Sequence, residues 1–406
     1  MGKIIFKKSD YRYSSAIIGA KENVLLAAAV KCSQNIDKGI SWGYNEIVAK
    51  ISSDGGESWS EEKTVLAPPA RKITADEGNT KSAFFINPTL LTAPNGDFVI
   101  VFTFYPECMG EEDEKLLDKK KTPFTGFNSK TYPVLYDRDG NYFIVLEDGK
   151  VIDSSKQPTE YTVKGLGELY RGEEYLGNIH LNGAMGKSEG LGKTSFGAPL
   201  KSPKRSYIMM IKSSDGINWS EPKDITPNVI CESDGACVRT SKGNGAVCEN
   251  GRMIVPLTAP KGAAFIYSDD NGESWNRNMR MPYIPVKEDI SVLQTSGGEL
   301  LAVGKKACIS FDNGITWMKS KSKFAPIKAI ANGEKFMTSI NTKSGTVLVG
   351  GEFEYKKNKY KGVEYSEDTL SIAGGLLPCT DIKVFGGKYA TIYITPDNKE
   401  VSFDIM

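Results

Sequence analysis

The sequence predicts an all-β fold of the propeller class, and three observations support this. Strand-like segments follow one another along the chain, among them NVLLAAAVKC, DFVIVFTF and RMIVPLTA, while helical periodicity is scarce. A turn phrase that ends in tryptophan occurs four times. Most copies are spaced by roughly one four-stranded blade, which is about 40–50 residues long in repeats of this kind. A closed ring of blades is expected, because closure leaves no open sheet edge.

The repeated phrase has the chemistry of a structural turn. Its full form is Ser-x-Asp-x-Gly-x-Ser/Thr-Trp, as in SSDGGESW, SDDNGESW and SFDNGITW, and SSDGINW is one residue shorter. Serine and aspartate accept backbone hydrogen bonds in tight turns, glycine permits positive φ, and tryptophan buries a large ring. We therefore expect each copy to stabilise the turn of a β-hairpin, and we expect its residues to be neither catalytic nor metal-binding. The residues concerned are Asp54, Trp59, Asp215, Trp219, Asp270, Trp275, Asp312 and Trp317.

The spacing of these aspartates indicates an insertion. The second, third and fourth copies are separated by 55 and 42 residues, whereas the first two are separated by 161. A Ser-Glu-Asp at 366–368 resembles the start of a decayed further copy. The excess predicts a propeller formed by about 1–110 and 203–406, with residues 110–202 inserted in the second blade. Alternating apolar and polar residues with Asp-Gly turns predict antiparallel strands in the insertion.

Composition excludes several classes of protein. The net charge of +1 provides no basic field for nucleic acid. No apolar stretch approaches the roughly 18 residues needed to span a bilayer. No secretion signal is visible, so both a cytoplasmic location and secretion after removal of a leader stay open. Seven irregularly spaced cysteines and one histidine argue against a disulfide framework and a zinc site. We expect no metal and no cofactor.

The repeated phrase resembles the Asp-box, or BNR repeat, of sialidases (neuraminidases), and the resemblance spans essentially the whole chain. The segment LYDRDG…EDGKV is also similar to the β-domain inserted in large secreted bacterial sialidases. The resemblance implies a six-bladed, sialidase-like propeller and exo-α-sialidase chemistry, a glycoside hydrolysis. In that family three arginines bind the sialic acid carboxylate, and a tyrosine paired with a glutamate base attacks the anomeric carbon. A loop aspartate is the general acid and base.

The catalytic positions implied by this resemblance are only partly filled by the family's residues. Arg12, in Tyr-Arg-Tyr-Ser, stands at the first arginine. Asp289 stands at the glutamate base, and Lys305, 16 residues later, stands at the second arginine. Ser41 takes the place of the acid/base aspartate, and Cys379 takes the place of the nucleophilic tyrosine. The acid and the nucleophile are therefore both substituted.

Replacements for the missing groups are few. No arginine follows Arg280, so a third carboxylate-binding arginine is not found. Asp37 and Glu46 are the nearby carboxylates that would substitute for the acid if the loop moved. A thiolate at 379 is a possible nucleophile, but no histidine lies near it in sequence to activate it.

Three functions follow from this pattern. We expect a sialidase-like propeller that binds a sialoglycan or a related carbohydrate with weak or no hydrolysis. An active exo-sialidase or other glycoside hydrolase with non-standard residues is the first alternative. A propeller that binds a protein partner and has no sugar pocket is the second. A sugar pocket requires Arg12, Asp289 and Lys305 to approach one another near the propeller axis.

Overall fold

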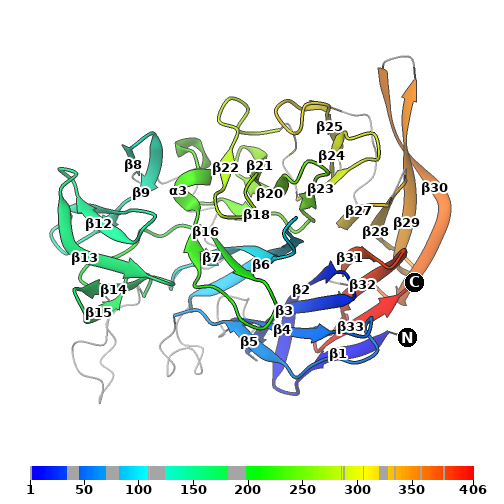
Figure 1. Cartoon of the computed structure of the whole chain (residues 1–406), viewed down its shortest axis with the longest axis horizontal. Coiled ribbons are helices and arrows are strands. Elements are labelled where there is room, and N and C mark those ends of the chain that lie inside the picture. The colour runs from blue at the N-terminus through cyan, green and yellow to red at the C-terminus, as the bar shows by residue number, and fades with distance from the viewer. Residues whose placement is uncertain are drawn as a thin grey trace.

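The protein is a ring of β-sheets with a separate β unit attached to one side, as a computed structural model shows (Figure 1). Six sheets of four or five strands are found within the described residues, and they form consecutive blades. The structure describes residues 2–33, 45–69, 82–107, 109, 124–181, 198–284, 286, 289–304, 306–319, 328–332, 335–356, 359–377 and 380–406.

Each blade is an antiparallel sheet whose first strand lies nearest the axis and whose last strand lies at the outside. Blade one has β2 (Tyr11–Lys21), β3 (Val24–Ser33), β4 (Asn45–Ser52) and β5 (Lys63–Leu66); blade two has β6 (Phe84–Thr92), β7 (Phe98–Tyr105), β16 (Tyr207–Ser213) and β17 (Lys223–Asp224). Blade three has β18 (Arg239–Thr240) and β19 (Ala246–Val247), then β20 (Met253–Ala259), β21 (Gly262–Ser268) and β22 (Asn276–Arg277).

The second half of the ring has the same order. Blade four has β23 (Ser291–Gln294), β24 (Leu300–Val303), β25 (Cys308–Ser310) and β26 (Met318–Lys319); blade five has β27 (Lys328–Asn332), β28 (Lys335–Thr342), β29 (Gly345–Lys356) and β30 (Lys359–Gly374). Blade six has β31 (Thr380–Phe385), β32 (Lys388–Ile394), β33 (Glu400–Ile405) and, from the other end of the chain, β1 (Lys3–Lys7).

The innermost strands close the ring around a central axis. β2 contacts both β6 and β31, β6 contacts β18 and β19, and β19 contacts β23. β27 completes the circle between β23 and β31. Blade six is completed by pairing of β1 with β33, in which Lys3 lies opposite Phe403. Both ends of the described chain therefore lie at the same blade (Figure 1).

The hydrophobic core consists of layers between adjacent blades. Leu26 of blade one packs in one layer with Phe102 of blade two, while Val101 packs in the next layer with Val255 of blade three. Consecutive residues of β7 thus face opposite neighbours, which explains why the whole strand is apolar and buried. Phe403 joins blade six to blade one in the same way. Burial of each such side chain contributes about 1.5–3 kcal/mol.

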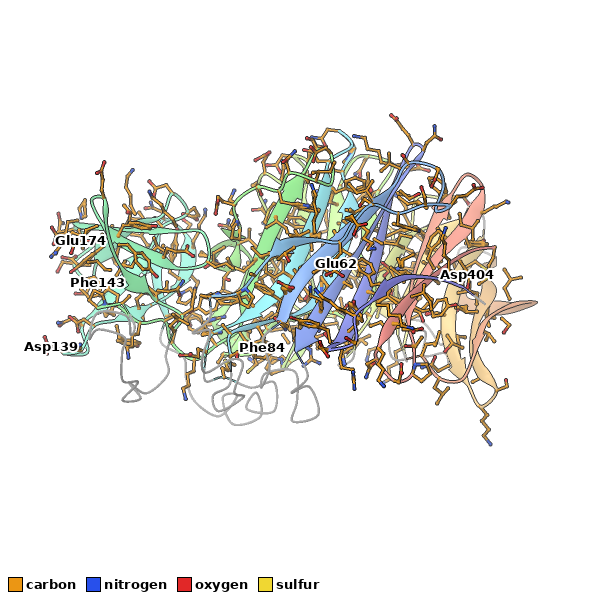
Figure 2. All side chains as sticks on the ribbon, turned by 90° about the horizontal axis from the view of Figure 1, so that it is seen from below. Glu62, Phe84, Asp139, Phe143, Glu174 and Asp404 are labelled. Carbon is orange, nitrogen blue, oxygen red and sulfur yellow. The ribbon has the colours of Figure 1, made fainter. Side chains whose placement is uncertain are left out.

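The attached β unit lies between β7 and β16, which pair directly with each other. Figure 2 shows its residues Asp139, Phe143 and Glu174 at the end of the molecule far from Asp404. The predicted fold class, a six-bladed propeller with an inserted β unit, is confirmed; the boundaries 110–202 stay a prediction. The unit contains β8 (Phe124–Phe127), β9 (Lys130–Pro133), β10 (Leu135–Tyr136), β11 (Tyr142–Val145), β12 (Lys150–Asp153), β13 (Pro158–Lys164), β14 (Glu168–Arg171) and β15 (Glu174–Asn178).

A buried ion pair anchors the connection between blades two and three. This connection contains the short helix α3 (Thr226–Val229) and the 3₁₀ turn η4 (Glu232–Asp234). Asp234 accepts two hydrogen bonds from Arg277 of β22, at 2.6 and 3.2 Å, and one from the Tyr283 hydroxyl at 2.7 Å. The Asp234 and Arg277 side chains are 0 and 1% exposed, so loss of either one would leave the other as a buried, unpaired charge.

Candidate functional site

The inner strands give the propeller two different faces. The C-terminal ends of these strands, including Ala20, Gln294 and Val384, line one cavity at the axis. The inner strands therefore run in the same direction, and their N-terminal ends gather at the opposite face. Arg12 is the second residue of β2, and Asp289 precedes β23 by two positions, so the fold places both on the second face.

Asp289 is held by donors from blade three. Its carboxylate accepts hydrogen bonds from the Thr258 hydroxyl at 2.9 Å and from the Lys242 backbone N–H at 3.2 Å. The Nη2 atom of Arg239 lies 4.0 Å from it. The Asp289 and Arg239 side chains are 29 and 24% exposed, so solvent and small ligands reach both. The site thus contains an anchored carboxylate next to a cation, an arginine that no motif in the sequence indicates.

Arg12 is half-buried at the start of β2 and has a different environment. Its Nη1 atom donates to the carbonyl of Tyr11 at 3.4 Å. Among the described residues, no carboxylate forms an ion pair with it, whereas Arg171, Arg239 and Arg277 each have such a partner.

Glu46, the alternative acid, is occupied by another interaction. Its carboxylate lies 2.5 Å from Nζ of Lys31, which also contacts Glu62 at 2.7 Å and the Tyr11 ring at 5.0 Å. The Lys31 side chain is 4% exposed; burial acts to lower the pKa of its amine, but the two glutamates outweigh it and the pKa is raised. The Glu46 carboxylate is thus engaged by a buried ammonium of the neighbouring strand.

The other predicted site residues lie outside the part of the chain that the structure describes. These are Ser41 at the acid/base position, Lys305 at the second arginine and Cys379 at the nucleophile, together with Asp37. The approach of Lys305 to the axis stays a prediction, as do the roles given to the other positions.

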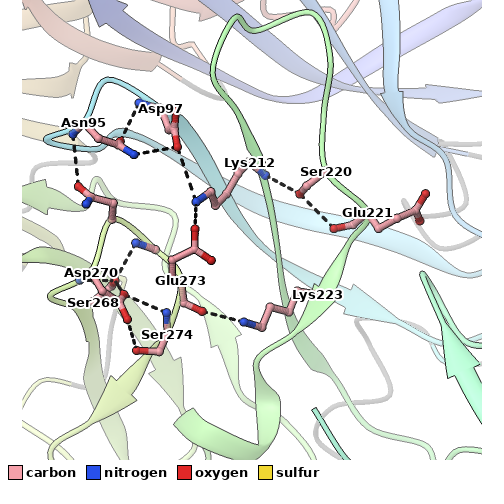
Figure 3. A network of polar contacts seen from close by, with 12 residues as sticks. Asn95, Asp97, Lys212, Ser220, Glu221, Lys223, Ser268, Asp270, Glu273 and Ser274 are labelled. Atoms are coloured by element: carbon pink, nitrogen blue, oxygen red, sulfur yellow. Dashed lines mark hydrogen bonds and ion pairs between the residues drawn. The ribbon is translucent and has the colours of Figure 1, made fainter. Parts of the chain in front are cut away.

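The repeated box is a hydrogen-bonded turn, and Figure 3 shows the one in blade three. Asp270 accepts from the backbone N–H and the hydroxyl of Ser274 at 2.9 and 2.5 Å. Ser268 donates to Asp270 at 2.8 Å and accepts from the Gly272 N–H at 2.8 Å. Partial burial opposes ionisation of Asp270, but these bonds outweigh it and lower its pKa. The pKa is lowered likewise for Asp54, Asp215 and Asp312.

The tryptophan of each box packs towards the preceding blade. Trp59 meets Phe403 edge-on with ring centroids 5.2 Å apart, and Trp317 stacks on Phe265 of blade three at 4.4 Å. Trp219 packs against the core layer between blades one and two, and Trp275 against the layer between blades two and three. These contacts support a structural role for the four boxes.

Polar contacts at the same turns also join blades. Lys212 of blade two forms ion pairs with Asp97 of its own blade, at 3.6 Å, and with Glu273 in the box turn of blade three. Lys223 of β17 donates to the Glu273 carbonyl at 2.7 Å. Figure 3 shows these residues between the two blades. The box turn of blade three is thus fastened both by its own residues and by its neighbour.

Two negative findings apply to the described part of the chain. It contains no group of three or more histidine, cysteine, aspartate or glutamate side chains that is arranged to hold a metal ion. It also contains no helix that is long and apolar enough to cross a membrane.

Comparison with known proteins gives the same fold. Residues 266–277, the box of blade three, match the BNR/Asp-box repeat family. The leech intramolecular trans-sialidase, solved with 2,7-anhydro-Neu5Ac, is similar with a TM-score of 0.77 and 18% identity over 100% of this chain and 70% of that chain. The intramolecular trans-sialidase from Ruminococcus gnavus has a TM-score of 0.73 and 18% identity, over 100% of this chain and 97% of that one.

A third similar structure is the NanB sialidase from Streptococcus pneumoniae. Its TM-score is 0.73 at 16% identity, over 99% of this chain and 69% of that chain. All three matches extend along the full length of this chain, so the chain has the fold of the sialidase superfamily with an Asp-box repeat.

Proposed function

We propose that this chain, with its sialidase-superfamily fold, binds a carbohydrate that carries a carboxylate, such as a sialoglycan, and hydrolyses it weakly or not at all. The observation that carries the proposal is the half-buried Arg12, which has no ion-paired carboxylate among the described residues. A guanidinium binds a carboxylate through two parallel hydrogen bonds, so it both attracts and orients an acidic sugar. Asp289 and Arg239 supply hydrogen-bonding groups at the same face.

Weak hydrolysis is proposed because the acid and the nucleophile are substituted. Ser41 at the acid/base position has a hydroxyl that does not donate a proton near neutral pH, and general acid catalysis contributes about 10²–10⁴-fold. Cys379 at the nucleophile position would attack only as a thiolate. Both effects act on one transition state and need not multiply, so the proposal is a severe deficit in turnover, without a specific rate.

The proteins of similar structure suggest the ligands to test. Two of them are intramolecular trans-sialidases, and one was solved with 2,7-anhydro-Neu5Ac prepared by soaking with 3′-sialyllactose. A sialylated glycan and an anhydro sugar that keeps the carboxylate are therefore the first probes. Lactose is the matched neutral probe, because it lacks the carboxylate that Arg12 would bind.

The test combines binding and turnover measurements on the purified chain. We expect 3′-sialyllactose to bind and lactose not to bind. Arg12→Ala should weaken the sialoside by about 10–100-fold, the value of one charge-assisted hydrogen-bonded pair. Arg138→Ala, at an exposed arginine of the attached β unit, is the control and should bind like the wild type.

Three results would overturn the proposal in different ways. A turnover of a fluorogenic sialoside on the order of 1 s⁻¹ or more, in the ordinary enzyme range, would favour the active glycoside hydrolase. No binding of any glycan on an array would favour the propeller that binds a protein partner. Equal binding by the Arg12→Ala variant and the wild type would show that the acidic group is recognised elsewhere.

A further inference from the structure

The cavity at the propeller axis lies on the face opposite Arg12 and Asp289. It has a volume of about 420 Å³, within the roughly 300–1,000 Å³ typical of small-molecule sites. Its walls come from the ends of the inner strands of all six blades, which converge there. The cavity is thus separated from the proposed sugar site by the length of the inner strands.

The walls combine apolar and polar groups. Leu91, Val292 and Ile330 provide apolar surface, while Asn244, Thr295 and Lys383 provide polar groups. Such a mixture suits a small molecule with a compact body and one charged or strongly polar group, because a few polar atoms then fix its orientation.

Lys383 of β31 is the positive charge among the described residues that line this cavity, and Glu249 is the negative one. Glu249 is exposed at the rim, so water screens it from an amine inside. Burial lowers the pKa of the Lys383 amine; Asp381 acts against this and Lys328 adds to it.

The nearest carboxylate is already engaged. Asp381 is buried, and its two oxygens accept the backbone N–H groups of Ile18 at 2.9 Å and of Ile382 at 2.8 Å. Lys328, also buried, donates instead to the carbonyl of Gly243 at 3.4 Å. Among the described residues, no hydrogen bond or ion pair of the Lys383 amine is found. The charged groups that act on the Lys383 amine are thus one carboxylate and a second lysine, so the three groups together carry a net positive charge.

We propose that this axial cavity is a binding site for a small organic oxyanion, a carboxylate or a phosphate, with Lys383 as its charged partner. An anion bound there would supply a counter-charge to the half-buried Lys383 amine and accept a charge-assisted hydrogen bond from it. The proposal does not depend on the sugar site, because no residue of that site lines this cavity.

Titration calorimetry on the full chain tests the site, at constant ionic strength, with sodium phosphate, sodium acetate and sodium benzoate as probes. We expect saturable one-site binding of at least one probe to the wild type. Phosphate alone would indicate a phosphorylated ligand, and benzoate over acetate would indicate a carboxylate with an apolar body. Lys383→Met should weaken binding by at least about tenfold. The control, Lys399→Met at an exposed lysine of blade six, should bind like the wild type.

A second measurement serves if Lys383→Met does not fold. In the wild type, an amine-reactive acylating reagent should modify Lys383 more slowly when the bound probe is present, as measured by peptide mass spectrometry, while Lys399 is modified at an unchanged rate. Absence of saturable binding by all three probes, equal affinity of Lys383→Met and wild type, or unchanged modification of Lys383 would each overturn the proposal. We do not expect 3′-sialyllactose to displace a probe from the axial cavity. If 3′-sialyllactose did not bind the chain at all, the proposed function would fail, but probe binding in the axial cavity would be unaffected.

Discussion

Replacement of Asp234 by alanine is expected to destabilise the propeller strongly. The substitution leaves the Arg277 guanidinium, 1% exposed, without the carboxylate that neutralises it and without its bonds of 2.6 and 3.2 Å. It also removes one of the hydrogen-bond partners of the Tyr283 hydroxyl. Loss of one partner of a buried ion pair costs about 3–5 kcal/mol, because the other charge stays buried and unpaired. That is a large part of the roughly 5–15 kcal/mol that stabilises an ordinary domain.

The chain offers a matched control at its surface. Asp269 also binds an arginine, Arg252, through two hydrogen bonds, of 2.7 and 2.8 Å. Its side chain is 55% exposed, so water replaces the lost partner and we expect Asp269→Ala to cost only about 0–1 kcal/mol. Both aspartates bind their arginine through two hydrogen bonds; the pairs differ in burial and in the further bond that Asp234 accepts from Tyr283.

Urea unfolding, followed by tryptophan fluorescence, measures both variants against the wild type. The free energy of unfolding extrapolated to water should fall far more for Asp234→Ala than for Asp269→Ala, with similar m-values. If the two losses agreed within about 1 kcal/mol, burial of the ion pair would not be what makes it costly to break, and the reasoning would fail.

Three further predictions concern protonation and catalysis. Burial lowers the pKa of His180 to about 3, so its imidazole should not titrate by NMR between pH 8 and 5. Because the unfolded state binds a proton in this range, the free energy of unfolding should fall by about 2 kcal/mol as the pH drops from 7 to 5. An NMR titration of His180 with its midpoint above pH 6 would contradict this. Asp270 has a lowered pKa, so its stabilising contribution is present above about pH 4 and is lost as the pH falls through that lowered pKa. The difference in free energy of unfolding between the wild type and Asp270→Asn should therefore shrink towards pH 2, and a difference that stayed constant would refute this prediction. The double variant Ser41→Asp, Cys379→Tyr should raise sialoside turnover at least about tenfold, and no change would direct attention to the missing arginines.

The fold was predictable because its strongest signal is local. Each box turn is held by bonds among residues no more than four positions apart, such as Ser268 with Gly272 and Asp270 with Ser274. The same few residue types therefore produce the same turn wherever they occur. The spacing between consecutive boxes then indicated the length of a blade. The additional residues between the first two boxes indicated the inserted β unit.

The decayed copy shows the limit of this reasoning. Residues 366–368 lie inside β30, not in a hairpin turn, so that Ser-Glu-Asp is no fifth box. Without the glycine and the tryptophan that follow, serine and aspartate do not specify a turn. The pairing of β29 with β30 is set by strand length and cross-strand contacts, which a motif search does not detect.

The candidate site was predictable only where a family position could be compared. Arg239 was missed because it lies 50 residues before Asp289 and reaches it through the packing of blade three on blade four. Glu46 looked available in the sequence, and its partner Lys31 becomes evident only when β3 and β4 pair. Contacts between distant segments depend on the packing of blades, and packing leaves no short pattern in the sequence.

The pairing of β1 with β33 has a consequence for biosynthesis. The ribosome makes Lys3–Lys7 almost 400 residues before Glu400–Ile405, which at about 5–20 residues per second means a delay of roughly 20–80 s. During that interval β1 has no partner, while blade one can already fold behind it. β1 is thus made long before the strand it pairs with, and the nascent protein must keep it from pairing elsewhere until β33 has been made.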